Sequence, residues 1–376
     1  MIFMVIFCTF CMTANAAEDS ESSFSFDDIY DDQLTVSGAS QLFDSLPENT
    51  KESLERLGIT AVNYDTITSL QFGTVINEVS AMLGANSRTP FCGMAACMGI
   101  MLLCSMLEGV NSTLSRTRLS SVMNAVGTMC VCTAVAVPLC QTAAKTAEIL
   151  NGVSGFMLLY IPILSGLMIS AGKEISGSAY YTLMMGSAEV IAAVSSKLVS
   201  PLVNAFLALT VTSSLSPKMN LSAICEAIYK TAKWVITFTM SIFVTIISLQ
   251  TVITSSMDNV SRRALRFAVS SFVPVVGGVL GEALTVFGGS LELLKSGAGV
   301  FVIIAAAFLF LPVILECIIW QFSLFLLSSA SDILGLSQMT RLFRTISKAT
   351  AMMLALLLCT LTVLIISTVI ILLVGS

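Results

Sequence analysis

Three carboxylates within apolar stretches are the residues best placed to carry chemistry. Glu189 and Glu316 each stand in the middle of an apolar run, and Glu282 follows the glycine-rich sequence PVVGGVLG. A charge at the centre of a bilayer is expensive and is rarely kept without a partner or water. Glu189 and Glu316 could therefore line an aqueous path, or they could bond helices together as polar contacts or protonated carboxyls. The sequence leaves both roles open.

A glycine-rich stretch, FVPVVGGVLGEALTVFGGSLELLKSGAG, occupies residues 272–299 and interrupts a hydrophobic segment. Broken helices at membrane depth are tolerated only where they are buried in protein or line a cavity, and transporters use them to aim helix ends at a substrate. The alternative is close packing through small residues, since Gly277 and Gly281 have GxxxG spacing. The candidate functional residues of this stretch are Pro274, Gly277, Gly278, Gly281 and Glu282.

No motif for a catalytic, cofactor or metal site is present. The chain has no histidine, which removes the commonest general base and the commonest metal ligand. Neither the spacing of Cys92 and Cys97 nor that of Cys130 and Cys132 is typical of a zinc site. A phosphate-binding loop and a nucleophile elbow are also missing. We therefore expect no enzyme and no cofactor, and energy for any transport would come from another subunit.

The elements that must position these carboxylates are membrane helices. Of the 376 residues, 56% are hydrophobic and 11% are charged, and the mean hydropathy is +0.92. Soluble domains carry about 25% charged residues, and a run of about 20 apolar residues crosses a bilayer. The sequence predicts an all-α, polytopic helical membrane protein with about seven to nine apolar spans. The apolar runs are 91–107, 121–144, 150–171, 175–196, 198–215, 234–255, 267–291, 297–328 and 350–374.

The basic connectors conflict with a simple series of crossings. Cytoplasmic loops are enriched in Lys and Arg, which fits Arg116 and Arg118 if the N-terminal region is outside. If every span crosses, however, the clusters at 262–266 and 341–348 both fall outside. We therefore expect at least one span to be re-entrant or interfacial. The basic, amphipathic connectors 220–233 and 332–348 could lie in the headgroup plane or could extend membrane helices.

The N-terminal region is strongly acidic and is predicted to be exported. Residues 1–16 resemble a signal peptide that ends in Ala14-Asn15-Ala16, with an uncleaved anchor as the alternative. Residues 17–40 are acidic and Ser-rich, which predicts a disordered spacer. An exported helical segment follows at 41–88, and the polytopic membrane domain covers 89–376. No basic stripe suggests nucleic-acid binding.

The exported segment has the sequence signals of two helices. A capping box at Ser45–Glu48 would open the first helix, which would run to Leu57 and end at Gly58. Asp65 would cap the second, whose apolar residues recur at helical spacing. Two helices are too few to hold a large core. We expect the pair to dock on a partner or to lie on the membrane surface.

Three sequence blocks carry a family resemblance over roughly residues 41–376. These are QLFDSLPENTKESLERLGI, the stretch SLSPKMNLSAICEAIYKTAKWVITFTMSIFVTIISLQ, and SRRALRFAVSSFVPVVGGVLGEALTVFGGSLELLKSGAGV. Together they resemble the stage III sporulation protein AE family. The block from Arg262 to Gly299 is the most specific part of the match.

The resemblance implies a role in endospore formation. Members of this family are multi-pass proteins of the mother-cell membrane around the forespore, with the N-terminal region in the intermembrane space. The implied partners are the other stage III A proteins, including a separate ATPase subunit and ring-forming subunits, together with the lipid bilayer. The implied function is that of a subunit, with a permease-like role, in a channel or secretion-like complex between mother cell and forespore. A non-conducting scaffold and a stand-alone secondary transporter are the alternatives.

Overall fold

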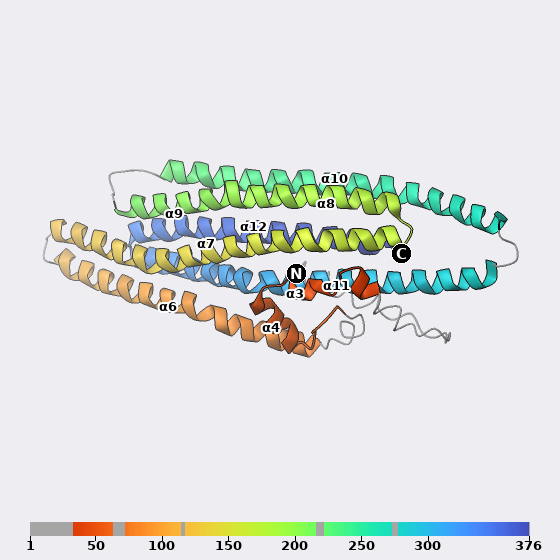
Figure 1. Ribbon diagram of the computed structural model, residues 1–376. Coiled ribbons are helices and arrows are strands. Elements are labelled where there is room, and N and C mark those ends of the chain that lie inside the picture. The colour runs from red at the N-terminus through yellow and green to blue at the C-terminus, as the bar shows by residue number, and fades with distance from the viewer. Residues whose placement is uncertain (1–32, 63–71, 114–116, 216–221, 273–276, 376) are drawn as a thin grey trace.

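A computed structural model of the chain describes residues 33–62, 72–113, 117–215, 222–272 and 277–375, which are almost entirely helical and contain no strand. The long helices of this part form six rods that run side by side in an elongated bundle (Figure 1). The third rod consists of three consecutive elements, with a short π-helix, η1, in its middle. The rods are α6 (Phe72–Thr113), α7 (Thr117–Ser170), α8–η1–α9 (Glu174–Ala193, Val194–Val199 and Ser200–Leu215), α10 (Ser222–Phe272), α11 (Gly277–Ile333) and α12 (Ser337–Gly375).

Several rods join segments that the sequence pattern divides at charged connectors. Helix α7 has 54 residues and unites the predicted spans 121–144 and 150–171. Their connector, KTAEI, holds neither proline nor glycine, and Lys, Ala and Glu are good helix formers, so the helix continues through it. At 1.5 Å per residue α7 is about 80 Å long, more than twice the roughly 30 Å of a hydrocarbon core. The charges interrupt the hydropathy pattern but not the helix.

Five helices in the described part of the chain are long and apolar enough to cross a membrane. Their apolar ranges are Gly73–Gly109, Ala125–Ser170, Ala223–Ser248, Gly289–Ile333 and Ser337–Leu372. The third rod contributes a shorter apolar helix, Ser200–Ser213. The all-helical prediction is therefore confirmed and a multi-pass membrane protein is indicated, whereas a count of seven to nine spans is not.

The direction of the rods brings separate basic clusters together. Successive rods run in opposite directions, so that α7, α10 and α12 all begin at one end of the bundle (Figure 1). Arg118 lies in the first turn of α7, the 230–233 lysines lie near the start of α10, and the 341–348 cluster lies near the start of α12. The conflict expected for the 341–348 cluster therefore disappears, whereas the conflict for the 262–266 cluster remains, because these residues lie near the end of α10 at the opposite end of the bundle. By the Lys/Arg rule, this is the end expected in the cytoplasm.

The N-terminal segment contains two short helices, α3 (Gln41–Asp44) and α4 (Glu48–Arg56). The predicted end of the first helix is confirmed, because Leu57 caps α4 and Gly58 takes the left-handed conformation with φ of 85°. The predicted capping box does not form. Pro47 is the N-cap, and the hydroxyl of Ser45 donates to the carbonyl of Leu42 at 2.8 Å instead.

The N-terminal segment docks on the bundle of its own chain. The rings of Phe43 and Phe301 lie 6.4 Å apart, between centroids, and the Ser290 hydroxyl donates to Gln33 Oε1 at 3.0 Å. At the other side of the segment, Arg56 bonds Glu78 of α6 at 3.1 Å. These contacts lie away from the end at which α7, α10 and α12 begin (Figure 1). The apolar residues of the first predicted helix are therefore buried within the chain, whereas Ile76 and Leu83 of the second, which forms the start of α6, are exposed.

These contacts also shift the predicted domain boundaries. Residues 33–40 pack in the structure, with Ala39 fully buried, so the spacer predicted to end at 40 is ordered in this part. Helix α6 runs without interruption through the predicted boundary at 88/89. The predicted signal peptide, the first part of the spacer and the helix start at Asp65 lie outside the described residues.

Candidate functional site

An ion pair between a buried carboxylate and a half-exposed lysine joins α7 to α11 in the middle of the bundle. The side chain of Glu316 is 4% exposed, and its Oε2 lies 2.9 Å from Nζ of Lys145. The hydroxyl of Thr142 donates to Glu316 Oε1 at 2.7 Å. Both carboxylate oxygens are therefore satisfied, one by a cation and one by a hydroxyl. Such compensation is what allows a carboxylate to remain charged among apolar helices.

The continuity of α7 places these partners on one face. Thr142, Lys145 and Thr146 are three and four residues apart, so they lie next to one another on the helix surface. Lys145 is 52% exposed, because its long side chain reaches from the surface of the bundle to the buried carboxylate. The pair is thus anchored inside the protein and accessible at one edge.

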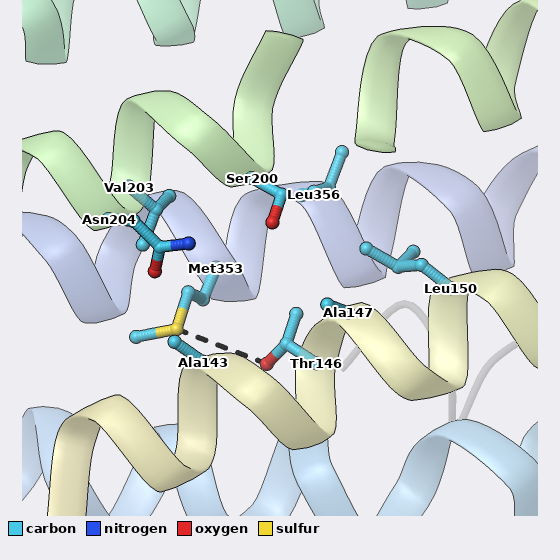
Figure 2. A pocket seen from close by; sticks show the side chains of 9 residues that line it. All are labelled: Ala143, Thr146, Ala147, Leu150, Ser200, Val203, Asn204, Met353 and Leu356. Atoms are coloured by element: carbon cyan, nitrogen blue, oxygen red, sulfur yellow. Dashed lines mark hydrogen bonds between the residues drawn. The ribbon is translucent and has the colours of Figure 1, made fainter. Parts of the chain in front are cut away.

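A small cavity lies one helical turn farther along α7 (Figure 2). It has a volume of about 20 Å³ and is enclosed by α7, α9 and α12. Thr146, Ser200 and Asn204 supply its polar atoms. The hydroxyl of Thr146 lies 3.9 Å from the sulfur of Met353, across the cavity (Figure 2). A volume of this size, with several polar neighbours, accommodates about one water molecule.

Polar contacts continue from α11 across α12 to α10. Gln321 donates to the hydroxyl of Ser347 at 2.7 Å and accepts from Thr350 at 2.8 Å. Next to Ser347, Lys348 bonds the carboxylate of Glu226 on α10. We call this set of residues the polar belt: Thr142, Lys145, Thr146, Ser200, Asn204, Glu226, Glu316, Gln321, Ser347, Lys348, Thr350 and Met353.

The third rod changes its helical form just before it reaches the cavity. Residues Val194–Val199 form the π-helix η1, and Ser200 of the cavity follows directly. The hydroxyl of Ser195 is buried and has no hydrogen-bond partner among the described residues. Short π-helical stretches within α-helical rods occur often at functional sites. The π-helical segment therefore directly precedes a residue of the polar belt, Ser200, along the same rod.

The comparisons with known proteins decide the family. The family model described as stage III sporulation protein AE matches residues 63–375, most of the chain. The chain belongs to this family. The resemblance inferred from the sequence is therefore confirmed, and the family carries a role in sporulation. All residues of the polar belt lie within the matched region, whereas α3 and α4 precede it.

A curated relative is similar over part of its length. The stage III sporulation protein AE of Bacillus subtilis (strain 168) is 24% identical over 154 residues, which are 41% of this chain and 38% of the relative. The aligned part is therefore less than half of either protein. No solved structure matches the chain.

The three carboxylates singled out from the sequence lie in different surroundings. Glu316 is the buried centre of the polar belt, whereas Glu189 is exposed on α8 and does not meet it. Glu282 lies within the first turns of α11, at the far end from the belt (Figure 1). Of the three carboxylates, Glu316 is the one that the structure places in the polar belt, and a functional role for any of them stays a prediction.

The glycine-rich stretch is a continuous helix where the structure describes it. Helix α11 begins at Gly277 and runs through Gly278 and Gly281 without a break, so of the two interpretations left open by the sequence, the broken helix does not hold for 277–299. Pro274 lies outside the described residues. Farther along, a Cβ on Gly299 would meet Leu372 of α12 at 2.8 Å. Small residues here permit close helix packing, as the alternative interpretation proposed.

Lys145 is the principal site residue that sequence reasoning missed. It is the only cation between residues 119 and 172, as Glu316 is the only charged residue between 296 and 331. Two isolated, opposite charges in apolar stretches are a signal for pairing, although they do not specify the partner. Among the described residues, no group of three or more His, Cys, Asp or Glu side chains is placed to hold a metal ion.

Proposed function

We propose that this protein is a permease-like membrane subunit of a channel or secretion-like complex between the mother cell and the forespore. Its family membership supports a sporulation role, and its apolar helices support a place in the membrane. The observation that carries the permease-like role is the buried pair of Glu316 and Lys145, which keeps charge in the middle of apolar rods. Intramembrane charges commonly mark ion or substrate pathways.

The proposed location is the mother-cell membrane that surrounds the forespore, with α3 and α4 in the intermembrane space. Two observations support this orientation: the N-terminal segment is acidic, and it docks away from the bundle end at which α7, α10 and α12 begin, where Arg118 and the 230–233 and 341–348 clusters lie. The proposed partners are other stage III A proteins, including ring-forming subunits and a separate ATPase. The proposal assigns no catalytic step to this chain.

A non-conducting scaffold is the second candidate, and the size of the cavity favours it. Sites for small molecules measure roughly 300–1,000 Å³. The cavity beside Thr146 is about 20 Å³, which is far too small for a solute. In this candidate the polar belt would bond helices together and would position the subunit within the complex.

A complementation experiment separates the two candidates. Glu316→Gln would replace the wild-type gene in the spore-forming host, with the exposed Glu189→Gln as the matched control. We expect normal amounts of Glu316→Gln protein on immunoblots but a several-fold loss of late forespore reporter expression. Normal reporter expression at a normal protein level would favour the scaffold. Normal sporulation after complete removal of the gene would contradict the proposed function as a whole.

A further inference from the structure

The starting halves of α10 and α12 together expose a basic face. Lys230 and Lys233 are exposed on α10, and Arg341 and Arg344 are exposed on α12. The acidic neighbours of this face are compensated, because Glu226 bonds Lys348 and Lys230, and Asp332 bonds Arg344. Five cations therefore meet two carboxylates, and a surplus of positive charge faces outward.

Direct contacts join the two helices into one surface. The bond between Lys348 and Glu226 links α12 to α10 at this level. The ammonium group of Lys348 also lies 5.6 Å from the centre of the Tyr229 ring, which adds a cation–π contact. Positions along α10 and α12 can therefore be compared, taking this contact as a common reference level.

Beyond this level the exposed residues of both helices are no longer charged. On α10 the exposed residues beyond Lys233 carry no charge, and the large ones are Trp234, Phe238 and Ile242, which are 63%, 51% and 44% exposed, with exposed Thr237 and Ser241 among them. The rings of Trp234 and Phe238 stack with centroids 5.0 Å apart. On α12 the exposed residues become Ala355 and Leu358, the latter 44% exposed. Both changes lie about 10–15 Å beyond the Lys348 contact, at 1.5 Å per residue.

A change from basic to apolar exposure, with an exposed tryptophan at the boundary, is typical of a membrane–water interface. Tryptophan is enriched at headgroup level, and cations just outside it attract anionic lipids. We infer that the face formed by residues 222–233 of α10 and 337–348 of α12 binds anionic phospholipid headgroups, with Trp234 at the boundary of the hydrocarbon. The inference concerns this face alone, because α6 and α11 expose apolar residues over a longer distance.

The lipid surface is favoured over a protein partner by the alignment of the two helices. A planar boundary requires that adjacent helices change character at one level, whereas a protein partner sets no such requirement. The face and its boundary also do not depend on whether the subunit conducts anything. The inference rests on its own observations, but it bears on the proposed function: Met353, which contacts Thr146 beside the Lys145–Glu316 pair, lies about 7 Å beyond Lys348, so the pair would lie at the edge of the hydrocarbon.

The two tryptophans of the chain provide the test. Trp234 is largely exposed, whereas Trp320 is fully buried. The full-length protein and its Trp234→Phe variant would be placed in vesicles of phosphatidylcholine and phosphatidylglycerol in which one lipid is brominated. The fluorescence of the full-length protein minus that of the variant gives the signal of Trp234 and its quenching. The variant, which keeps only the buried Trp320, is the matched control.

We expect Trp234 to be quenched more strongly by bromine near the headgroup than by bromine near the chain end. At equal content, brominated phosphatidylglycerol should quench several-fold more than brominated phosphatidylcholine. Replacing Lys230, Lys233, Arg341 and Arg344 with glutamine should abolish this preference. Equal quenching by the two lipids, strongest quenching by deep bromine, or no quenching of Trp234 would each overturn the inference.

Discussion

Lys145→Met is expected to lower the stability of the solubilised protein by about 2–4 kcal/mol, because it leaves the buried Glu316 carboxylate without its cation. We expect a loss in the lower part of this range, because Lys145 is half exposed and water can reach its place. Glu316→Gln should be milder, because its amide oxygen can still accept from Thr142 and Lys145 can turn toward solvent. Thermal unfolding in detergent measures all of these effects.

The double variant Lys145→Met/Glu316→Gln makes this prediction specific. It removes both charges, so it should be more stable than Lys145→Met alone. Glu189→Gln, on the exposed face of α8, should unfold at the same temperature as the wild type. If Lys145→Met behaves like Glu189→Gln, or if the double variant is the least stable of the set, the ion pair does not hold α7 to α11.

Gly177→Ala is expected to destabilise the contact between α7 and α8 by about 1–3 kcal/mol, the usual range for an overpacked site. A Cβ at this position would lie 2.7 Å from Cγ1 of Ile169 and 3.0 Å from the carbonyl oxygen of Ser165. The carbonyl belongs to the backbone of α7, so it cannot move aside as a side chain could. The variant should show a lower unfolding temperature and faster proteolysis near the α7–α8 turn.

Gly186→Ala is the matched control on the same helix. Nothing lies within 4 Å of the Cβ it would add, and the residue is in the helix interior. Alanine there should be neutral or stabilising by up to about 1 kcal/mol, because it restricts the unfolded chain more than glycine does. Equal behaviour of the two variants would show that α7 and α8 are not in close contact at Gly177.

Local features of this chain could be read from its sequence. Apolar composition predicts the helical membrane fold, and Gly58 marks the end of α4 because a left-handed residue terminates a helix there. Glu316 could be singled out because an isolated charge in an apolar run needs compensation. Each of these inferences depends on neighbouring residues alone.

The arrangement of the rods could not be read in the same way. Hydropathy divides α7 at Lys145, although a lysine between good helix formers leaves the helix intact. The partner of Lys145 is 171 residues away, and no local pattern specifies that distance. The packing of Phe43 on Phe301 could not be predicted either. The sequence shows that the N-terminal segment has apolar residues to bury, but not whether they pack on the same chain or on a partner. The same error in dividing helices produced the conflict over the 341–348 cluster, whereas the 262–266 arginines, near the end of α10, remain at the opposite end of the bundle.

The most direct test of the six-rod bundle is to find on which side of the membrane each of three single cysteines reacts. Thr117→Cys, Glu174→Cys and Ser337→Cys, each in a background without native cysteines, would be treated with an impermeant thiol reagent before and after the membrane is opened. The rods place residues 117 and 337 at one end of the bundle and residue 174 at the other (Figure 1). We predict that residues 117 and 337 share one side, which is the cytoplasm, and that residue 174 reacts from the outside. Residues 117 and 174 on one side, with 337 on the other, would be the pattern of nine separate crossings and would contradict the six-rod bundle.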